Sequence, residues 1–361
     1  MKQRLLSLDV LRGFDMFWIL EPTYPIFHAM LVALGLSGCW LDMQLDHPEW
    51  VGFTFYDTIY PLFLFMAGVS FPYSYASSVK RGLSTGGILL KILKRIVILY
   101  ALGAWITILY NEPAWGANFK HVSVLGRIGL TWGAAAVLYV FCSWKQRLTA
   151  VAVLFAAYWL FLGKGIADQA TCIPTRLDET VFWPYLHAKG TVGLIAMIGT
   201  ALFGMAAGDW LRIPDERISR SRKALGLLAA SLVAVALGLL MAFGFGRFSL
   251  PIIKNAWTPS FALVSGGYSF AMLALFYWLI DIRGWTCWAF PFKVVGMNSV
   301  AAYVLSRTVF NYYHLQGFLF GGLMRCCPTP AWGEFVGESC YLVIYWLLLY
   351  YLYRKEVFLK A

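Results

Sequence analysis

Apolar residues run through this chain in long stretches, and most of the polar residues lie in the shorter segments between them. A helix of roughly 20 apolar residues crosses the hydrocarbon core of a bilayer, where every backbone polar group must be bonded internally. The pattern predicts about ten such helices, at residues 8–34, 54–78, 88–110, 122–143, 147–163, 190–211, 222–245, 258–280, 291–314 and 339–353. We therefore expect an all-α, polytopic membrane bundle.

Composition agrees with this pattern. Of the 361 residues, 60% are hydrophobic and 13% charged, which excludes a soluble globular domain. No soluble module interrupts the apolar runs, so we expect residues 1–361 to form a single transmembrane domain.

Basic residues predict the orientation of the bundle. Lysine and arginine gather in alternate loops, for example at Lys80, Arg81, Lys145, Arg147 and Arg220. Short loops rich in these residues face the cytoplasm, so both termini are expected there. This topology explains the net charge of +11, and we expect the bilayer, not nucleic acid, as the partner of the basic loops.

Ionisable residues in the first predicted helix are costly in a membrane and should face a partner or a cavity. Asp9 and Arg12 are three residues apart, hence on one helical face, and are expected to pair at the cytoplasmic end. Glu21 lies deeper and is followed by Pro22 and Pro25, which break or kink a helix. Freed carbonyls beside a carboxylate predict a polar cavity and a catalytic role for Glu21.

His47 is the most informative residue. It lies at a predicted membrane edge, between Asp46 and Glu49 and beside Trp50, where a histidine can titrate near neutrality and move a proton. Asp57 follows within a few helical turns, and a carboxylate can fix the tautomer of a histidine. The alternative is an interface histidine without chemistry.

Three further polar residues stand in otherwise apolar helices. Arg127, between small residues, suits an anion such as a phosphate or a buried carboxylate. Asn298 and Ser299 offer an amide and a hydroxyl. Their alternative role is interhelical hydrogen bonding, which is common in membrane bundles.

Polar residues near the outer helix ends are candidates for substrate binding. Trp257 follows Lys254 and Asn255 and could stack on a sugar ring, although tryptophan also belongs to ordinary interface belts. Glu49 and Trp50, beside His47, are expected to contact the same substrate.

These motifs together resemble one family, in order along nearly the whole chain. They are Arg4–Gly13 (RLLSLDVLRG), His47-x-x-Trp50-x-Gly52-x-Thr54-x-x-Asp57 with Pro61, Gly126–Gly129 (GRIG), Lys254–Trp257 (KNAW), Gly296–Ser299 (GMNS) and Tyr351–Phe358 (YLYRKEVF). The pattern is similar to membrane acetyltransferases of the heparan-α-glucosaminide N-acetyltransferase type and their bacterial relatives.

The resemblance implies transfer of acetyl from cytosolic acetyl-CoA to an amino sugar or glycan across the membrane, with His47 in the active site. The sequence departs from the family at Glu21, near the position of a family asparagine, and at Arg307, which replaces a His-Glu neighbourhood. Whether nitrogen or oxygen is acetylated therefore stays open. The resemblance also suggests a homodimer and, through the bacterial relatives, a location in a bacterial inner membrane.

Two roles for His47 fit these residues. As a general base it would take the proton of the acceptor, oriented by Asp57 or Asp46; as a nucleophile it would carry the acetyl group. Asn298, Ser299 or Arg127 would stabilise the oxyanion. Basic residues at the inner mouth, namely Arg12, Lys94 and Arg95, would hold the phosphates of acetyl-CoA.

A different class of function stays open. A proton-coupled transporter or flippase for a sugar or similar solute would use Glu21, Asp57 and Arg307 as a relay and His47 as a gate. The absence of a visible internal repeat disfavours it. The five histidines are scattered, so no metal is expected in either case.

Overall fold

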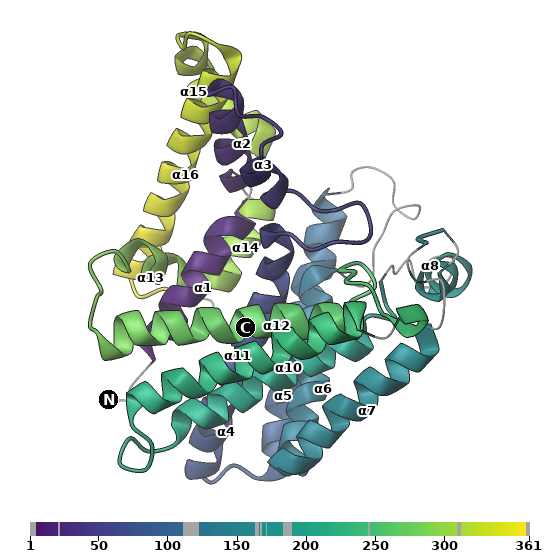
Figure 1. Ribbon diagram of the computed structural model, residues 1–361. Helices are drawn as coiled ribbons and strands as arrows, with labels where there is room; N and C mark the ends of the chain where they lie inside the picture. The colour runs from purple at the N-terminus through teal and green to yellow at the C-terminus, as the bar shows by residue number, and fades with distance from the viewer. Residues whose placement is uncertain are drawn as a thin grey trace. The chain divides into compact units, whose positions relative to one another are not determined.

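The computed structural model describes residues 5–20, 22–110, 123–162, 166, 168–170, 172–182, 190–244, 246–308 and 312–358. Every regular element in these ranges is helical (Figure 1). Arg4 and Glu21, which the sequence singles out, lie outside the described residues.

Seven described segments are long and apolar enough to cross a membrane, which confirms an all-helical, multi-pass membrane protein. They are Phe55–Lys80, which contains α4 (Ile59–Lys80), α6 (Val124–Phe141), α7 (Trp144–Leu162), α10 (Leu194–Arg212), α11 (Arg220–Phe243), Pro259–Ile282, which contains α12 (Pro259–Phe276), and α16 (Pro330–Arg354). The predicted span 88–110 corresponds to α5 (Thr85–Tyr110), whose first half carries Lys91, Lys94 and Arg95. The count of about ten and the cytoplasmic termini stay predictions.

The chain divides into two compact units. Unit 1 comprises Met1–His47, Thr54–Ile59 and Leu279–Ala361, and unit 2 comprises Pro48–Phe53 and Tyr60–Trp278. His47 and Asp57 thus belong to the same unit, although part of the segment between them belongs to the other.

In unit 1, α1 (Leu6–Ile19) packs closely on α13 (Phe290–Met297). Two glycines allow the approach. A Cβ atom on Gly13 would lie 1.6 Å from the carbonyl oxygen of Phe292, and one on Gly296 would lie 1.9 Å from that of Asp9. Both glycines lie in or beside motifs that carry the family resemblance, so part of that pattern records helix packing.

The first predicted helix is interrupted. It forms α1 and then α2 (Thr23–Ala33), with Leu20 extended and Pro22 capping the second helix, as the prolines predicted. Figure 1 shows α2 beside α16, and the two helices are in contact. A five-residue helix, α3 (Trp40–Gln44), follows in the predicted loop.

The C-terminal region corrects three predictions. The single helix expected at 291–314 is wrong, because the chain leaves helical geometry at Asn298, between α13 and α14 (Ser299–Thr308). The loop predicted over 315–338 contains most of a further helix, α15 (Tyr312–Arg325). The last helix begins at Pro330 rather than 339, because Thr329 caps it by accepting a hydrogen bond from the amide of Trp332.

In unit 2, α11 and α12 form the most extensive helix pair, α5 packs on α6, and α10 contacts α6, α7 and α12. Between the predicted spans 147–163 and 190–211 lie the short helix α8 (Ile173–Leu177) and a π-helical turn, Asp178–Phe182.

Candidate functional site

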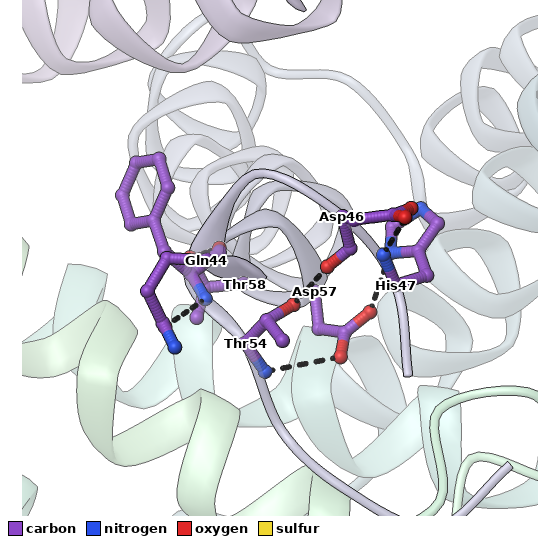
Figure 2. Close-up of polar contacts among 7 residues, drawn as sticks. Gln44, Asp46, His47, Thr54, Asp57 and Thr58 are labelled. Carbon is purple, nitrogen blue, oxygen red and sulfur yellow. Dashed lines mark hydrogen bonds and ion pairs between the residues drawn. The ribbon is translucent and has the colours of Figure 1, made fainter. Parts of the chain in front are cut away.

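The side chains of His47 and Asp57 form a hydrogen-bonded pair (Figure 2). Nδ1 of His47 lies 2.8 Å from Oδ1 of Asp57. The carboxylate is completely buried, whereas the imidazole is 45% exposed. A carboxylate at Nδ1 holds the proton on that nitrogen, which leaves Nε2 of a neutral ring as the basic atom.

A short 3-10 helix, Phe55–Thr58, places Asp57. Thr54 is its N-cap, and Thr54 and Asp57 form a reciprocal capping box, with the Thr54 amide donating to Oδ2 of Asp57 over 3.2 Å. Such a box satisfies the free amides at the start of a helix. Asp57 therefore gives one oxygen to the backbone and the other to His47, which fixes its carboxylate plane.

Asp46 forms hydrogen bonds that fix the main chain around His47 and Thr54. Its Oδ1 accepts from the His47 amide at 2.7 Å, and its carbonyl accepts from the Thr54 hydroxyl at 2.7 Å (Figure 2). The amide of Phe55 donates to Oε1 of Gln44 at 3.1 Å. Of the two carboxylates that the sequence offered for orienting the imidazole, the structure thus pairs Asp57 with the ring and Asp46 with the main chain.

A series of aromatic rings that the sequence analysis did not single out begins next to His47. The Tyr56 ring centroid lies 5.1 Å from that of His47, and its hydroxyl donates to the Trp18 carbonyl over 3.3 Å. Tyr24 of α2 lies 6.1 Å from Tyr56 and stacks on His28, with centroids 5.7 Å apart.

His28 belongs to a second histidine–carboxylate pair. Its Nδ1 lies 2.9 Å from Oδ1 of Asp42, whose Oδ2 accepts from the Gly38 amide at 2.8 Å. The hydrogen bond from Gly38, followed by that from His28, holds the pKa of Asp42 below its ordinary value. The only sequence signal for this group was the four-residue spacing of Tyr24 and His28, which gives both one face if the segment is helical.

Arg127 lies in the first turn of α6, which Ser123 caps. Its guanidinium packs against Gly190, where a Cβ atom would lie 3.1 Å from Nη1 and the φ angle of +69° already favours glycine. Asp178 accepts a hydrogen bond from the Gly190 amide. Both roles that the sequence offers for Arg127, anion binding and interhelical hydrogen bonding, stay predictions.

Trp257 is only 4% exposed. Its indole donates to Oγ1 of Thr200 at 3.3 Å, and its ring meets Tyr60 and Phe261 edge-on. The backbone takes a left-handed φ of 47°, rare for a bulky residue. The ring thus packs against protein side chains, and stacking on a substrate stays a prediction.

The neighbours of Trp257 differ from it in exposure. Lys254 is half-buried, and its carbonyl closes a turn by accepting from the Trp257 amide at 2.9 Å. Asn255 and Glu49 are exposed, whereas Trp50 is anchored by a 2.8 Å hydrogen bond from Nε1 to the Ile166 carbonyl. Asn255 and Glu49 are thus accessible to solvent, unlike the ring of Trp257.

Asn298 and Ser299 lie at the break between α13 and α14. Asn298 is buried, and its Nδ2 donates to the Val357 carbonyl at 3.0 Å, tying the C-terminal segment to the helix junction. Ser299, half-buried, begins α14. The structure shows a structural bond for Asn298; the catalytic and binding roles stay predictions.

The three basic residues predicted for the donor have different settings. Arg12 pairs with Asp9 over 3.2 Å, as their spacing predicted. Arg95 lies over the Trp132 ring at 4.2 Å, and Lys94 is exposed. No group of three histidine, cysteine, aspartate or glutamate side chains that could hold a metal ion occurs in the described part of the chain.

The fold and the site together define a class of protein. It is an all-helical, multi-pass membrane protein with a histidine–carboxylate pair at the start of a spanning segment. More particularly, the chain belongs to the heparan-alpha-glucosaminide N-acetyltransferase family, because the profile of that family's catalytic part matches residues 4–251.

Two relatives agree with this assignment. Heparan-alpha-glucosaminide N-acetyltransferase of Mus musculus is 25% identical over 98% of this chain and 61% of its own length. The Homo sapiens protein of that name is 25% identical over 99% of this chain and 60% of its own. The chain thus spans about three fifths of the length of these relatives.

Proposed function

We propose that this protein is a membrane acetyltransferase that moves an acetyl group from cytosolic acetyl-CoA to an amino sugar on the opposite side of the membrane. The observation that carries the proposal is the pairing of His47 with buried Asp57. Family membership supports the reaction class, since the relatives are named as glucosaminide N-acetyltransferases.

In the proposed reaction, neutral His47 acts through Nε2. The acceptor nitrogen attacks the thioester carbonyl, and its proton passes to Nε2 as the new C–N bond forms. Asp57 stabilises the resulting imidazolium, which lies against its ionised carboxylate. The C–S bond then breaks, and the imidazolium returns the proton to the departing thiolate to give CoA.

The competing route has Nε2 attack the thioester directly and carry the acetyl group as an acetyl-imidazole. Labelled acetyl-CoA without acceptor separates the two routes. Label that accumulates on wild-type protein, and not on His47→Ala, identifies the carrier. Absence of labelled protein, in a preparation that transfers acetyl once acceptor is added, identifies the base.

Other residues enter the proposal with narrower roles. Asn298, Ser299 and Arg127 are the candidate donors to the developing oxyanion, a contribution of about 10²–10³ in kcat for one donor. Arg12, Lys94 and Arg95 are the candidates for the phosphates of CoA. Glu49, Asn255 and Lys254 are candidate acceptor contacts, and Glu21 is a further candidate acid or base.

Acetyl transfer in proteoliposomes tests the proposal. Wild-type protein should transfer label from acetyl-CoA to glucosamine-type acceptors, and His47→Ala should lose about 10²–10⁴ of that rate while keeping its fold. Failure of wild-type protein to acetylate amino sugars or hydroxyl acceptors, together with solute uptake that needs no acetyl-CoA, would favour the transporter instead. The relay in that alternative includes Asp57, which the structure pairs with His47.

A further inference from the structure

Tyr24 and His28 form an aromatic surface on one face of α2. They are one helical turn apart, and their ring planes differ by 8° with centroids 5.7 Å apart. At that separation the stack is offset, so each ring leaves part of its face uncovered. The His28 side chain is 40% exposed, and Tyr24 is half-buried.

Each ring also carries a polar atom that is available to a ligand. The contact with Asp42 uses Nδ1 of His28, and neither Nε2 of His28 nor the Tyr24 hydroxyl meets a hydrogen-bond partner among the described residues. The Asp42 carboxylate is held in turn by the Gly38 amide. The imidazole is therefore held through Nδ1, while Nε2 has no hydrogen-bond partner in the described part of the chain.

This surface continues to the catalytic pair. The ring of Tyr56 connects the two groups. Its centroid lies 6.1 Å from that of Tyr24 and 5.1 Å from that of His47. All these residues belong to unit 1. The Tyr24–His28 stack is therefore connected to His47 through one intervening ring, that of Tyr56.

The charge around the surface suits a cation. The carboxylate of Asp42 contacts His28, whose ring stacks on that of Tyr24. Aromatic faces beside carboxylates bind ammonium groups, and they also cover the apolar C–H face of a sugar ring while neighbouring polar atoms bond its hydroxyls.

We propose that Tyr24 and His28 form the subsite that binds the sugar ring of an amino-sugar acceptor beside His47. This inference rests on the proposed function and adds to it the residues that select the acceptor. The Tyr24 hydroxyl and Nε2 of His28 would bond sugar hydroxyls, and Asp42 would position His28.

Paired substitutions distinguish this role from a structural one. In His28→Asn the amide nitrogen can replace Nδ1 and keep the bond to Asp42, but nothing replaces Nε2. In His28→Gln the amide can replace Nε2, but the bond to Asp42 is lost. Tyr24→Phe removes one hydroxyl, and Tyr351→Phe, at an exposed position of α16, is its control.

Steady-state transfer should show an acceptor KM raised about three- to tenfold in Tyr24→Phe and His28→Asn, as expected for one lost hydrogen bond. Their kcat and their KM for acetyl-CoA should stay near wild type. His28→Gln should keep most acceptor affinity but unfold at a lower temperature. Tyr351→Phe should match wild type throughout.

Unchanged acceptor KM in Tyr24→Phe and His28→Asn, with active wild-type protein, would overturn the subsite and leave the proposed function intact. If only His28→Gln lost acceptor affinity, the His28–Asp42 pair would have a structural role alone, and the subsite would again be overturned. If wild-type protein transfers nothing, titration with glucosamine decides: weaker binding by Tyr24→Phe and His28→Asn than by wild type supports the subsite, and equal or absent binding rejects it.

Discussion

The proposed chemistry depends most on Asp57. Its carboxylate is buried, so the groups that hydrogen-bond to it decide whether it is stable there as an ion. A buried carboxylate is costly unless hydrogen bonds and an opposite charge compensate for its lost hydration. Here Oδ1 meets His47 and Oδ2 meets the Thr54 amide. The same bonds that make its burial tolerable fix the tautomer and direction of the imidazole.

Thr54→Ala tests whether this cap serves catalysis. Loss of the hydroxyl removes its bonds to the cap and to the Asp46 carbonyl, which should cost about 1 kcal/mol of stability. Because Asp57 would then be held less firmly, kcat should fall by about 10- to 100-fold with little change in acceptor KM. Thr54→Ser keeps the hydroxyl and should stay near wild type. Wild-type kcat in Thr54→Ala would show that the cap has no part in positioning the pair.

The His47–Asp57 pair could be predicted because both residues lie in one short motif, whose Thr54-x-x-Asp57 pattern also marks a capping box. The pair of His28 and Asp42 could not. It depends on how α2 and α3 turn toward each other, and the spacing of these residues matches no local rule. The burial of Trp257 could not be predicted either, since the sequence gives its position near a helix end but not the packing that encloses its ring.

At the scale of elements, the crossing of α1 and α13 shows what two of the sequence motifs do. Gly13 and Gly296 permit backbone contact that any side chain would obstruct. Close approach of this kind favours helix association in membranes. Lipid tails are as apolar as the helix side chains, so the hydrophobic effect does not drive helices together there, and van der Waals packing does. The long apolar helices were predictable from length alone. The division at Asn298 and the helix α15 were not, since continuous apolarity hides a break and a helix of 14 residues is too short to register as a span.

Gly13→Ala should therefore destabilise unit 1. The new methyl group would overlap the Phe292 carbonyl, and overpacking typically costs about 1–3 kcal/mol. Gly317→Ala in α15 is the matched control, because no atom lies within 4 Å of its added Cβ; it should be neutral or stabilising by up to about 1 kcal/mol. Thermal unfolding in detergent measures both. Equal midpoints for the two variants would contradict the packing seen between α1 and α13.

For the whole molecule, the proposal is that the membrane separates acetyl-CoA from the acceptor. The basic loops predict which side is cytoplasmic, and therefore where acetyl-CoA is available, while the acceptor is proposed to lie on the other side. The homodimer and the bacterial inner membrane that the sequence suggests belong to the same proposal. In the proposed reaction any acceptor reaches Nε2 of His47, so the chemistry can be tested without knowing the orientation.

The most direct measurement is therefore the rate of acetyl transfer by His47→Asn in proteoliposomes. Asparagine can keep the hydrogen bond to Asp57 through its amide nitrogen but offers no base or nucleophile in place of Nε2. We predict wild-type folding and acetyl-CoA binding with transfer reduced by about 10²–10⁴. Transfer at the wild-type rate by a folded His47→Asn protein would contradict the role of His47 in the reaction.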